Sequence, residues 1–382
     1  MHVKEDISYL KGWLANAARR ARELSELAHR RNARTVFTIS STAKPTPRRR
    51  PYLTPLRQNS LCVYSGAVVF TQVQAVLLCR CLDGVVDYVL VDAEKKIPII
   101  LEPDAALLEK DDRERMAGLS HTVLGTHSGN LTQACHDHVV KSRFYEFKPN
   151  DLTANAVWHL ISKKLQFLSG RRFAIIGCGN IGFKLALKLL ESDATVNLVR
   201  RDVHAGFHLA NTMNMIKPAS TLAHANFTTD GLKAAYRCDA LIGCSSEPEV
   251  VTWEMVSAMR QGGFVVDVGK GNLTPEAIEN SLAHGLEVIR ADITAALDGE
   301  IVTIMRNERL LEEEMGRRGH HGLMLISGGA YGRAGDLVVD KAVKPKTFFG
   351  VSNGRGDLKQ VSEYTTADRR AIKKLQQWIA RP

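Results

Sequence analysis

Residues 171–202 constrain the fold of this chain more than any other segment. They read RRFAIIGCGNIGFKLALKLLESDATVNLVRRD, which is a short apolar strand, a glycine-rich turn, an apolar-periodic helix and a second strand. The turn fits the pattern G-x-G-x-x-G, which alone is weak evidence. Here it joins a strand to a helix inside a β-α-β unit of about 30 residues, the context that the pattern requires. The segment therefore predicts part of a doubly wound parallel sheet, the Rossmann type of α/β fold.

Each glycine of this turn has an expected role. Gly177 permits the tight turn, Gly179 lets a phosphate approach the backbone, and Gly182 lets the helix pack on the strand. Unpaired N–H groups and the helix dipole favour an anion at the start of the helix. We therefore expect a dinucleotide whose diphosphate contacts Gly177, Gly179, Asn180, Ile181 and Gly182. The alternative is a Rossmann-like half-sheet that binds no nucleotide.

The end of the second strand distinguishes the two nicotinamide cofactors. An acidic residue there binds the ribose 2′-hydroxyl of NAD, whereas arginine accommodates the 2′-phosphate of NADP. Val199 is followed by Arg200 and Arg201, whose guanidinium groups can pair with a phosphate. Asp202 lies 20 residues past Gly182, a spacing that also suits NAD. Because the arginines come first, the sequence favours NADP, with NAD as the alternative.

Two further strand-and-turn units follow, DALIGCSS (239–246) and GFVVDVGKG (263–271). Ligands of open α/β sheets bind outside the carboxyl ends of the strands, so both turns are expected near the cofactor. They add five candidate cofactor-binding residues: Cys244, Ser245, Ser246, Val268 and Gly269. Ordinary turn chemistry is the alternative for both.

The charge of +10 is unevenly distributed. Residues 1–60 hold 13 Lys and Arg against four Asp and Glu, a net charge of +9, and the other 322 residues carry +1. Residues 6–34 have the periodicity of an amphipathic helix, and 40–55 are proline-rich. The favoured interpretation of 1–58 is a basic helical arm and linker docked on the protein or on a second subunit. The alternative is a contact with RNA or an acidic partner. A nearly neutral remainder disfavours a nucleic-acid-binding protein.

Other classes of protein are excluded by composition. No apolar run approaches the 18 or so residues that a membrane span needs. The start, MHVKEDISYL, has no apolar core of a secretion signal. Seven cysteines are scattered without disulfide or zinc spacing, so we expect no metal and a reducing, cytoplasmic location.

A smaller α/β domain is expected before the glycine-rich turn. Its predicted strands are 61–71, 86–92, 96–101 and 122–126, and its predicted helices are 104–117 and 130–142. Residues 153–168 resemble a connecting helix. The predicted organisation is a basic arm and linker (1–58), a catalytic α/β domain (59–152, rejoined by about 322–382) and a Rossmann domain (153–321) that faces it across a cleft.

The chain resembles the amino-acid-dehydrogenase-like Rossmann superfamily, which contains shikimate dehydrogenase, glutamyl-tRNA reductase and methylenetetrahydrofolate dehydrogenase. The resemblance covers mainly 150–290. Arg201 matches the arginine of the Asn-Arg-Thr stretch of shikimate dehydrogenases, Asp151 matches their catalytic aspartate, and residues 322–326 resemble their Gly-x-x-Met-Leu segment. The resemblance implies an N-terminal catalytic domain and an NADP domain. The motif that carries the family's catalytic lysine is absent, which places shikimate in doubt as the substrate.

Hydride transfer needs a group that gives or takes a proton and cations that orient a polar substrate. The candidates are Asp151 and Asn155, four residues apart, with Lys95, Lys96 and Lys141. A lysine beside an aspartate in a cleft can be tuned toward a neutral pKa. The alternatives are a helix N-cap for Asp151 and solvated surface charges for the lysines.

Two glycine-rich stretches remain, residues 327–333 and 350–356. Each is either an anion-binding nest or an ordinary loop, and Tyr331 and Arg333 stand out in the first. The sequence as a whole predicts an NADP(H)-dependent oxidoreductase acting on a small anionic amino, imino or keto acid, as a homo-oligomer with a dimer favoured. The alternatives are a lyase or cyclase that uses bound nicotinamide transiently, and a non-catalytic dinucleotide sensor with a partner-binding arm.

Overall fold

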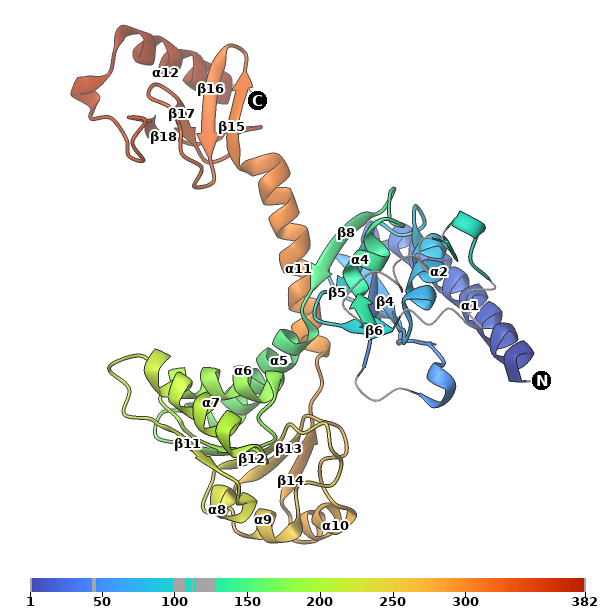
Figure 1. The fold of residues 1–382 in the computed structure, drawn as a ribbon. Helices are drawn as coiled ribbons and strands as arrows, with labels where there is room; N and C mark the ends of the chain where they lie inside the picture. Colours follow the sequence, from blue (N-terminus) through green and yellow to red (C-terminus); the bar gives the residue numbers. More distant parts are fainter. Residues whose placement is uncertain (1, 43–45, 99–106, 112, 115–127, 381–382) are drawn as a thin grey trace. The chain divides into compact units, whose positions relative to one another are not determined.

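The computed structural model describes residues 2–42, 46–98, 107–111, 113–114 and 128–380 (Figure 1). It divides the chain into two units, Met1–Asp298 and Gly299–Pro382. The first unit contains two six-stranded sheets whose main strands are parallel, so the predicted α/β class is confirmed. The predicted strand 122–126 lies outside the described residues, as does half of the predicted helix 104–117.

Four parallel strands form the centre of the first sheet, in the order β4-β1-β5-β8. They are β1 (Arg34–Ser40), β4 (Cys62–Val68), β5 (Tyr88–Asp92) and β8 (Arg143–Phe147). Two short strands, β2 (Tyr52–Leu53) and β3 (Arg57–Gln58), pair antiparallel with β4. Strand β1 pairs on both sides, and its Val36, Phe37 and Ile39 are fully buried. The predicted separation of residues 1–58 from the domain that begins at 59 is therefore wrong.

Helix α1 (His2–Arg31) is a structural part of this first domain. One face of the helix is buried in the same core as the sheet, through Leu10, Trp13, Ala17, Ala21, Leu24 and Ala28. The predicted helix and its docked position are confirmed. The helix docks because burying an apolar side chain stabilises the fold by roughly 2 kcal/mol for each large side chain. The domain also contains helices α2 (Gln72–Leu82) and α4 (Leu131–His136) and the antiparallel pair of β6 (Lys96–Pro98) and β7 (Ser128–Asn130).

The second sheet is parallel throughout, in the order β11-β10-β9-β12-β13-β14. In chain order this is 3-2-1-4-5-6, the strand order of the Rossmann fold. The strands are β9 (Arg172–Ile176), β10 (Thr195–Val199), β11 (Ala225–Thr228), β12 (Ala240–Gly243), β13 (Phe264–Asp267) and β14 (Glu287–Arg290). One core includes α5 (Pro149–Leu165), α6 (Asn180–Glu191) and α7 (Val203–Ile216), and the other includes α8 (Gly231–Ala235), α9 (Trp253–Ser257) and α10 (Pro275–Ala283). The predicted doubly wound sheet is confirmed.

The second unit has a sheet and a core of its own. After α11 (Thr294–Arg309) and a short π-helix (Leu310–Glu314), its strands run in the order β15-β16-β17-β18. They are β15 (Gly316–His320), β16 (Leu323–Ser327), β17 (Leu337–Val339) and β18 (Phe348–Val351), and helix α12 (Thr366–Ile379) packs on them through Leu375. The predicted return of 322–382 to the first domain, and a Rossmann domain that extends to 321, are therefore wrong. None of the described helices is long and apolar enough to cross a membrane.

Candidate functional site: the glycine turn before helix α6

Two glycines of the turn between β9 and α6 are required by the fold. Gly177 has φ +91°, and a Cβ there would lie 2.7 Å from the backbone N of Ser245. A Cβ on Gly182 would lie 2.7 Å from the carbonyl oxygen of Gly177. Contacts this short do not occur for real Cβ atoms, so the close approach of strand, helix and neighbouring loop needs glycine at both positions.

Gly179 differs from its neighbours because none of the described residues occupies the space beside it. A Cβ built there has no heavy atom within 4 Å. Gly179 and Asn180 are exposed, whereas Gly182 is buried. Glycine at this position is therefore not explained by packing within the chain. It leaves open space over the start of α6, which is the role expected of the second glycine in a phosphate-binding turn.

The start of α6 is uncapped. Gly179 is the N-cap and offers no side chain, and the first helical hydrogen bond runs from the Phe183 N–H to the Gly179 carbonyl at 2.8 Å. The N–H groups of Asn180, Ile181 and Gly182 thus have no acceptor within the helix. Burial raises the pKa of the Cys178 thiol to about 11, although the charge of Arg200 acts to lower it. The turn therefore presents backbone donors, while its buried Cys178 thiol stays neutral.

The arginines after β10 are arranged differently from Asp202. Arg200 is half-buried and donates to the carbonyl oxygen of Cys178 at 2.8 Å, which holds its side chain against the glycine turn. The Arg201 side chain is 90% exposed and lies 3.6 Å from Glu247. Asp202 is the N-cap of α7, and its carboxylate accepts from the Ala205 N–H at 3.0 Å. One carboxylate oxygen of Asp202, the residue whose spacing suits NAD, is thus already engaged in capping α7.

The loops after β12 and β13 are joined by Asn272, which the sequence analysis did not single out. Its side chain accepts from the Ser245 N–H at 3.0 Å and donates to the carbonyls of Ser245 and Glu247 at 2.9 and 2.8 Å. It is fully buried. The only sequence signal was its place directly after the Gly-Lys-Gly turn; its role depends on a contact with a loop 27 residues away.

The predicted cofactor residues on these loops have structural partners. The Ser245 hydroxyl accepts from the Glu247 N–H at 3.0 Å, and the N–H groups of Val268 and Gly269 donate to Gly243 at 2.8 and 3.1 Å. Burial raises the pKa of the Cys244 thiol, so that this thiol stays neutral. Ser246 is exposed. Among these residues, Ser246 is the one whose side chain is open to solvent, while the others shape the loops.

Asp151 is on the first turn of α5 and pairs with a lysine that the sequence analysis did not consider. Lys184, on α6, binds Asp151 and also binds Glu94 at 2.8 Å. Burial would lower the pKa of Lys184, but hydrogen bonds from Lys184 to Asp151 and Glu94 and their charges raise it. The lysine beside Asp151 is therefore held in its charged form, the opposite of the neutral shift that the sequence analysis expected of a lysine beside an aspartate.

The predicted lysines lie at two edges of the first sheet. Lys95 follows β5, at the carboxyl edge where β8 leads into α5 and Asp151. Lys96 begins β6, beside Lys95. Lys141 precedes β8 and lies at the amino edge, roughly 16 Å from the other end of that strand. The structure thus does not bring Lys141 together with Asp151, whereas Asn155 lies one helical turn beyond Asp151 on α5.

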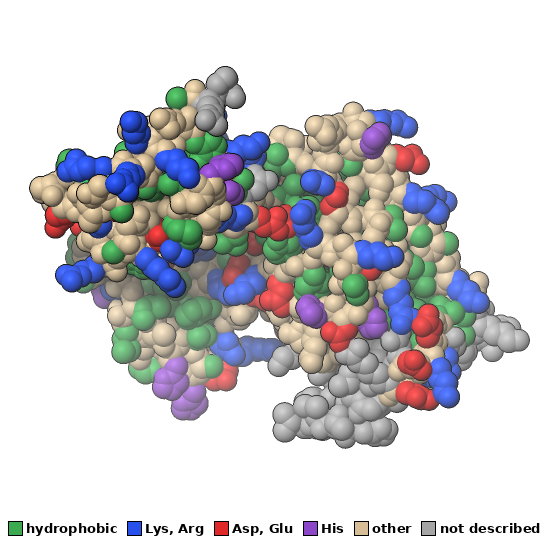
Figure 2. Space-filling view, turned by 90° about the horizontal axis from the view of Figure 1, so that it is seen from above, with side chains coloured by type: hydrophobic (Ala, Val, Ile, Leu, Met, Phe, Trp, Pro, Cys, Tyr) green, Lys and Arg blue, Asp and Glu red, His purple; other side chains and the backbone are tan. Residues whose placement is uncertain are grey.

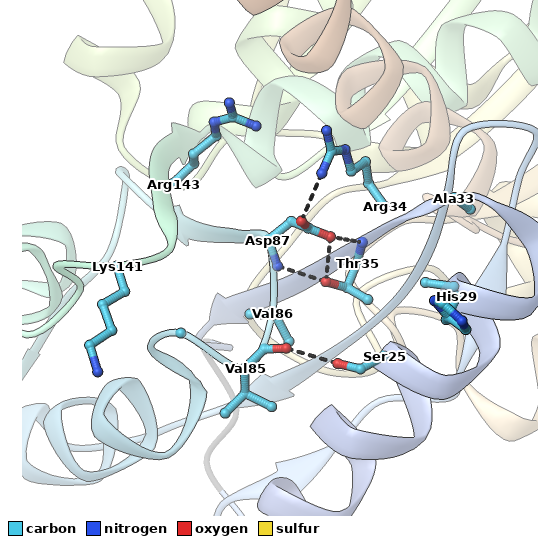
Figure 3. A pocket seen from close by; sticks show the side chains of 12 residues that line it. Ser25, His29, Ala33, Arg34, Thr35, Val85, Val86, Asp87, Lys141 and Arg143 are labelled. Atoms are coloured by element: carbon cyan, nitrogen blue, oxygen red, sulfur yellow. Dashed lines mark hydrogen bonds and ion pairs between the residues drawn. The ribbon is translucent and has the colours of Figure 1, made fainter.

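Lys141 instead lines a shallow hollow of about 570 Å³ (Figure 3). Other polar side chains around this hollow are those of His29, Arg34, Asp87 and Arg143. In Figure 3 the Lys141 and Arg143 side chains point away from each other, so they do not converge on one point. Because Lys141 lies at the amino edge of the first sheet, this hollow is separate from the carboxyl edge that holds Lys95 and Asp151.

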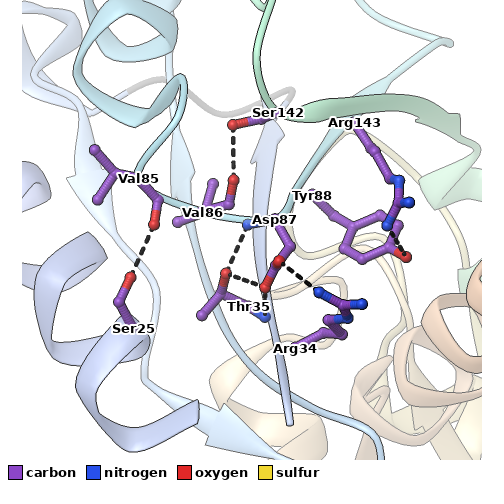
Figure 4. A network of polar contacts seen from close by, with 9 residues as sticks. All are labelled: Ser25, Arg34, Thr35, Val85, Val86, Asp87, Tyr88, Ser142 and Arg143. Atoms are coloured by element: carbon purple, nitrogen blue, oxygen red, sulfur yellow. Dashed lines mark hydrogen bonds and ion pairs between the residues drawn. The ribbon is translucent and has the colours of Figure 1, made fainter. Parts of the chain in front are cut away.

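The polar network beside this hollow joins neighbouring strands of the first sheet (Figure 4). Asp87 accepts from the N–H and the hydroxyl of Thr35, both at 2.8 Å, and from Arg34 at 3.1 Å. Arg143 donates to the Tyr88 hydroxyl at 3.2 Å. These bonds link β1, β5 and β8, so we assign the network a role in holding the sheet together and not in catalysis.

Within the described part of the chain, no group of three or more His, Cys, Asp or Glu is arranged to hold a metal ion.

Comparisons with known proteins give only distant matches. No family model and no curated protein matches the chain. L-tryptophan dehydrogenase from Nostoc punctiforme is 12% identical, with a TM-score of 0.38, over 72% of this chain and 74% of that one. Dipicolinate synthase A chain from Bacillus subtilis is 13% identical, with a TM-score of 0.35, over 72% and 78%. Ornithine carbamoyltransferase from Pyrococcus furiosus is 11% identical, with a TM-score of 0.35, over 72% and 86%. Because each TM-score is below 0.5, the Rossmann assignment depends on the strand order and the glycine turn of this chain.

Proposed function

We propose that this chain is an NADP(H)-dependent oxidoreductase that binds its cofactor at the start of α6. One observation carries the proposal: Gly179 leaves an uncapped, exposed helix start at the carboxyl end of β9, the first strand of a 3-2-1-4-5-6 sheet. The partial positive charge of a helix N-terminus and its free N–H groups stabilise a bound diphosphate.

The residues present fit a dinucleotide. Asn180, Ile181 and Gly182 would donate N–H groups to the diphosphate, and the space beside Gly179 would admit it. When bound, the nicotinamide ring of such a cofactor accepts or supplies a hydride. The chain's own contribution is to fix the dinucleotide on the backbone and to set the loops after β12 and β13 through Asn272.

The preference for NADP follows from the end of β10. Arg200 is fixed against the glycine turn and Arg201 extends into solvent, so both guanidinium groups lie at the strand end, where a 2′-phosphate would replace Glu247 as the partner of Arg201. The one acid in this turn, Asp202, caps α7. A free carboxylate at this place would favour the 2′-hydroxyl of NAD instead.

The proposed substrate is a small anionic amino, imino or keto acid. Asp151, Lys95 and the charged Lys184 lie at or next to the carboxyl edge of the first sheet, where cations can orient a carboxylate. Asp151 remains the proposed proton-handling group, with Lys184 as the cation that positions it. The homodimer and the cytoplasmic location expected from the sequence stay predictions.

Cofactor preference tests the proposal directly. Isothermal titration should show NADPH binding more tightly than NADH, and Arg201→Ala should weaken NADPH about tenfold while it leaves NADH unchanged, since a phosphate contact to a charged donor contributes roughly 1.5 to 3 kcal/mol. Arg172→Ala is the matched control, because it removes an exposed arginine at the opposite end of β9. Equal affinities of the parent for NADPH and NADH would refute the NADP assignment. Oxidation of NADPH by a panel of keto and imino acids then tests the substrate class.

A further inference from the structure

The C-terminal sheet and helix are far more basic than the rest of the protein. Residues 316–382 contain 13 Lys and Arg and five Asp and Glu, a net charge of +8. Residues 61–315 contain 25 Lys and Arg and 32 Asp and Glu, a net charge of −7. The near neutrality of everything beyond residue 60 is therefore an average of an acidic middle and a basic end. The basic end coincides with a sheet and helix that have their own core.

Two of the five acidic residues of this region, Asp336 and Asp368, are buried. Asp336 is 3% exposed and accepts two bonds from Arg317, at 2.7 and 3.1 Å. Asp368 is 4% exposed and binds Lys359 at 2.7 Å. Burial would raise the pKa of Asp368, but the hydrogen bonds from Lys359 and Thr365 hold it below its ordinary value. Two of the five carboxylates thus neutralise arginine and lysine internally, and the remaining surface is dominated by cations.

Helix α12 presents the densest group of these cations. Arg369, Arg370, Lys373 and Lys374 are all exposed and, at 100° per residue, fall within about 140° of the helix circumference. Within the described residues, none of them has a carboxylate within ion-pair distance. The opposite face is covered, since Leu375 is fully buried in the sheet core. This helix therefore has no apolar face left to insert into a membrane.

The two glycine-rich stretches lie together beside the start of α12. They follow strands β16 and β18. A Cβ on Gly356 would lie 3.0 Å from the Tyr331 ring, and a Cβ on Gly335 would lie 3.6 Å from the Asp368 carboxylate. Tyr331 is 85% exposed, and Arg333 in the same loop is also exposed. An aromatic ring and arginine thus stand on loops that touch each other and the first turn of the basic helix.

We propose that residues 316–382 bind single-stranded nucleic acid. Proteins that bind such strands combine a cationic surface for the phosphates with exposed aromatic rings on which bases stack. Here α12 supplies the phosphate contacts, and Tyr331, exposed and held against Gly356, supplies the stacking ring. Lys and Arg side chains also stand out on the surface seen in Figure 2. An acidic protein partner would account for the cations but not for the exposed Tyr331 in a glycine-rich loop.

Fluorescence anisotropy with the full-length chain tests this proposal. The probe is a fluorescein-labelled oligouridine of about 20 nucleotides, and the parent should bind it at physiological salt. Arg370→Gln with Lys373→Gln should weaken binding about tenfold and reduce the slope of log K against log salt by about 1.4, since each phosphate contact to a single strand contributes about 0.7. Tyr331→Ala should weaken binding about tenfold, and Tyr331→Phe should retain it, because stacking needs only the ring.

The matched control is Arg19→Gln with Arg22→Gln, which removes the same charge from the exposed side of α1. This control should leave binding and its salt slope unchanged. Failure of the parent to bind the oligonucleotide would overturn the proposal, as would equal losses in the α1 and α12 variants. Tighter binding to phosphatidylserine vesicles than to RNA would also contradict it and would assign the surface to a membrane.

Discussion

The first turns of two helices, α2 and α6, differ in a way that explains where this protein can bind an anion. Both helices follow a parallel strand. At α2 the N-cap is Thr71, whose hydroxyl accepts from the Gln74 N–H at 3.2 Å, and Thr71 is 2% exposed. At α6 the N-cap is Gly179, exposed and without a side chain. The same supersecondary unit is therefore closed in one sheet and open in the other, and the N-cap residue makes the difference.

The carboxyl ends of the two sheets differ in a second respect. Asp267 ends β13, and its two carboxylate oxygens accept from the N–H groups of Gly271 and Asn272 at 2.6 and 3.3 Å. Asp92 ends β5 and is fully buried, and its Oδ2 has no hydrogen-bond partner within the described residues. Burial raises the pKa of Asp92 to about 6, although the N–H of Glu94 acts to lower it. One aspartate is thus held by its loop and the other is left costly to ionise.

The buried carboxyl of Asp92 should give the largest effect on stability. In the folded protein Asp92 keeps its proton up to about pH 6, whereas the unfolded chain releases it near pH 4. Its contribution to stability is therefore complete below about pH 4 and is lost as the pH rises through 6. We compare the change in the free energy of unfolding that Asp92→Asn causes at two pH values. This change should be more favourable at pH 8 than at pH 4 by up to roughly 3 kcal/mol. Urea denaturation at both pH values measures this, and a pH-independent difference would contradict the account.

The next effect concerns the fold of the open turn. Gly182→Ala places a Cβ 2.7 Å from the Gly177 carbonyl, so we expect a loss of about 1 to 3 kcal/mol of stability. Gly12→Ala in α1 is the matched control, because a Cβ there meets nothing within 4 Å. It should stabilise the protein by up to about 1 kcal/mol through helix propensity. A higher unfolding temperature for Gly182→Ala than for Gly12→Ala would contradict this, because it would show that the turn tolerates a Cβ beside the Gly177 carbonyl.

The Thr71 cap of α2 should give the smallest effect. Thr71→Ala removes the cap of α2 and should cost about 1 kcal/mol of stability. The affinity for NADPH should not change, since the cofactor is assigned to α6. A variant that loses cofactor binding in proportion to its stability would mean that the two helix starts are not independent.

The Rossmann domain was predictable because its signals are local. The glycine turn, the strand end at Val199 and the alternation of strands and helices occur within short segments. Strand β1 was missed because its residues lie between a basic helix and a proline-rich stretch, and its pairing with β4 and β5 is long-range. Lys184 and Asn272 were missed for the same reason, because their partners come from distant parts of the chain.

Gly179→Val is the sharpest test of whether the open start of α6 binds a dinucleotide. A side chain at this position enters empty space, so the fold and the thermal unfolding temperature should be unchanged. We expect isothermal titration to detect NADPH binding to the parent and an affinity at least about 100-fold lower for this variant, because the side chain would occupy the place of the diphosphate. Unchanged NADPH affinity in a folded Gly179→Val protein would contradict it.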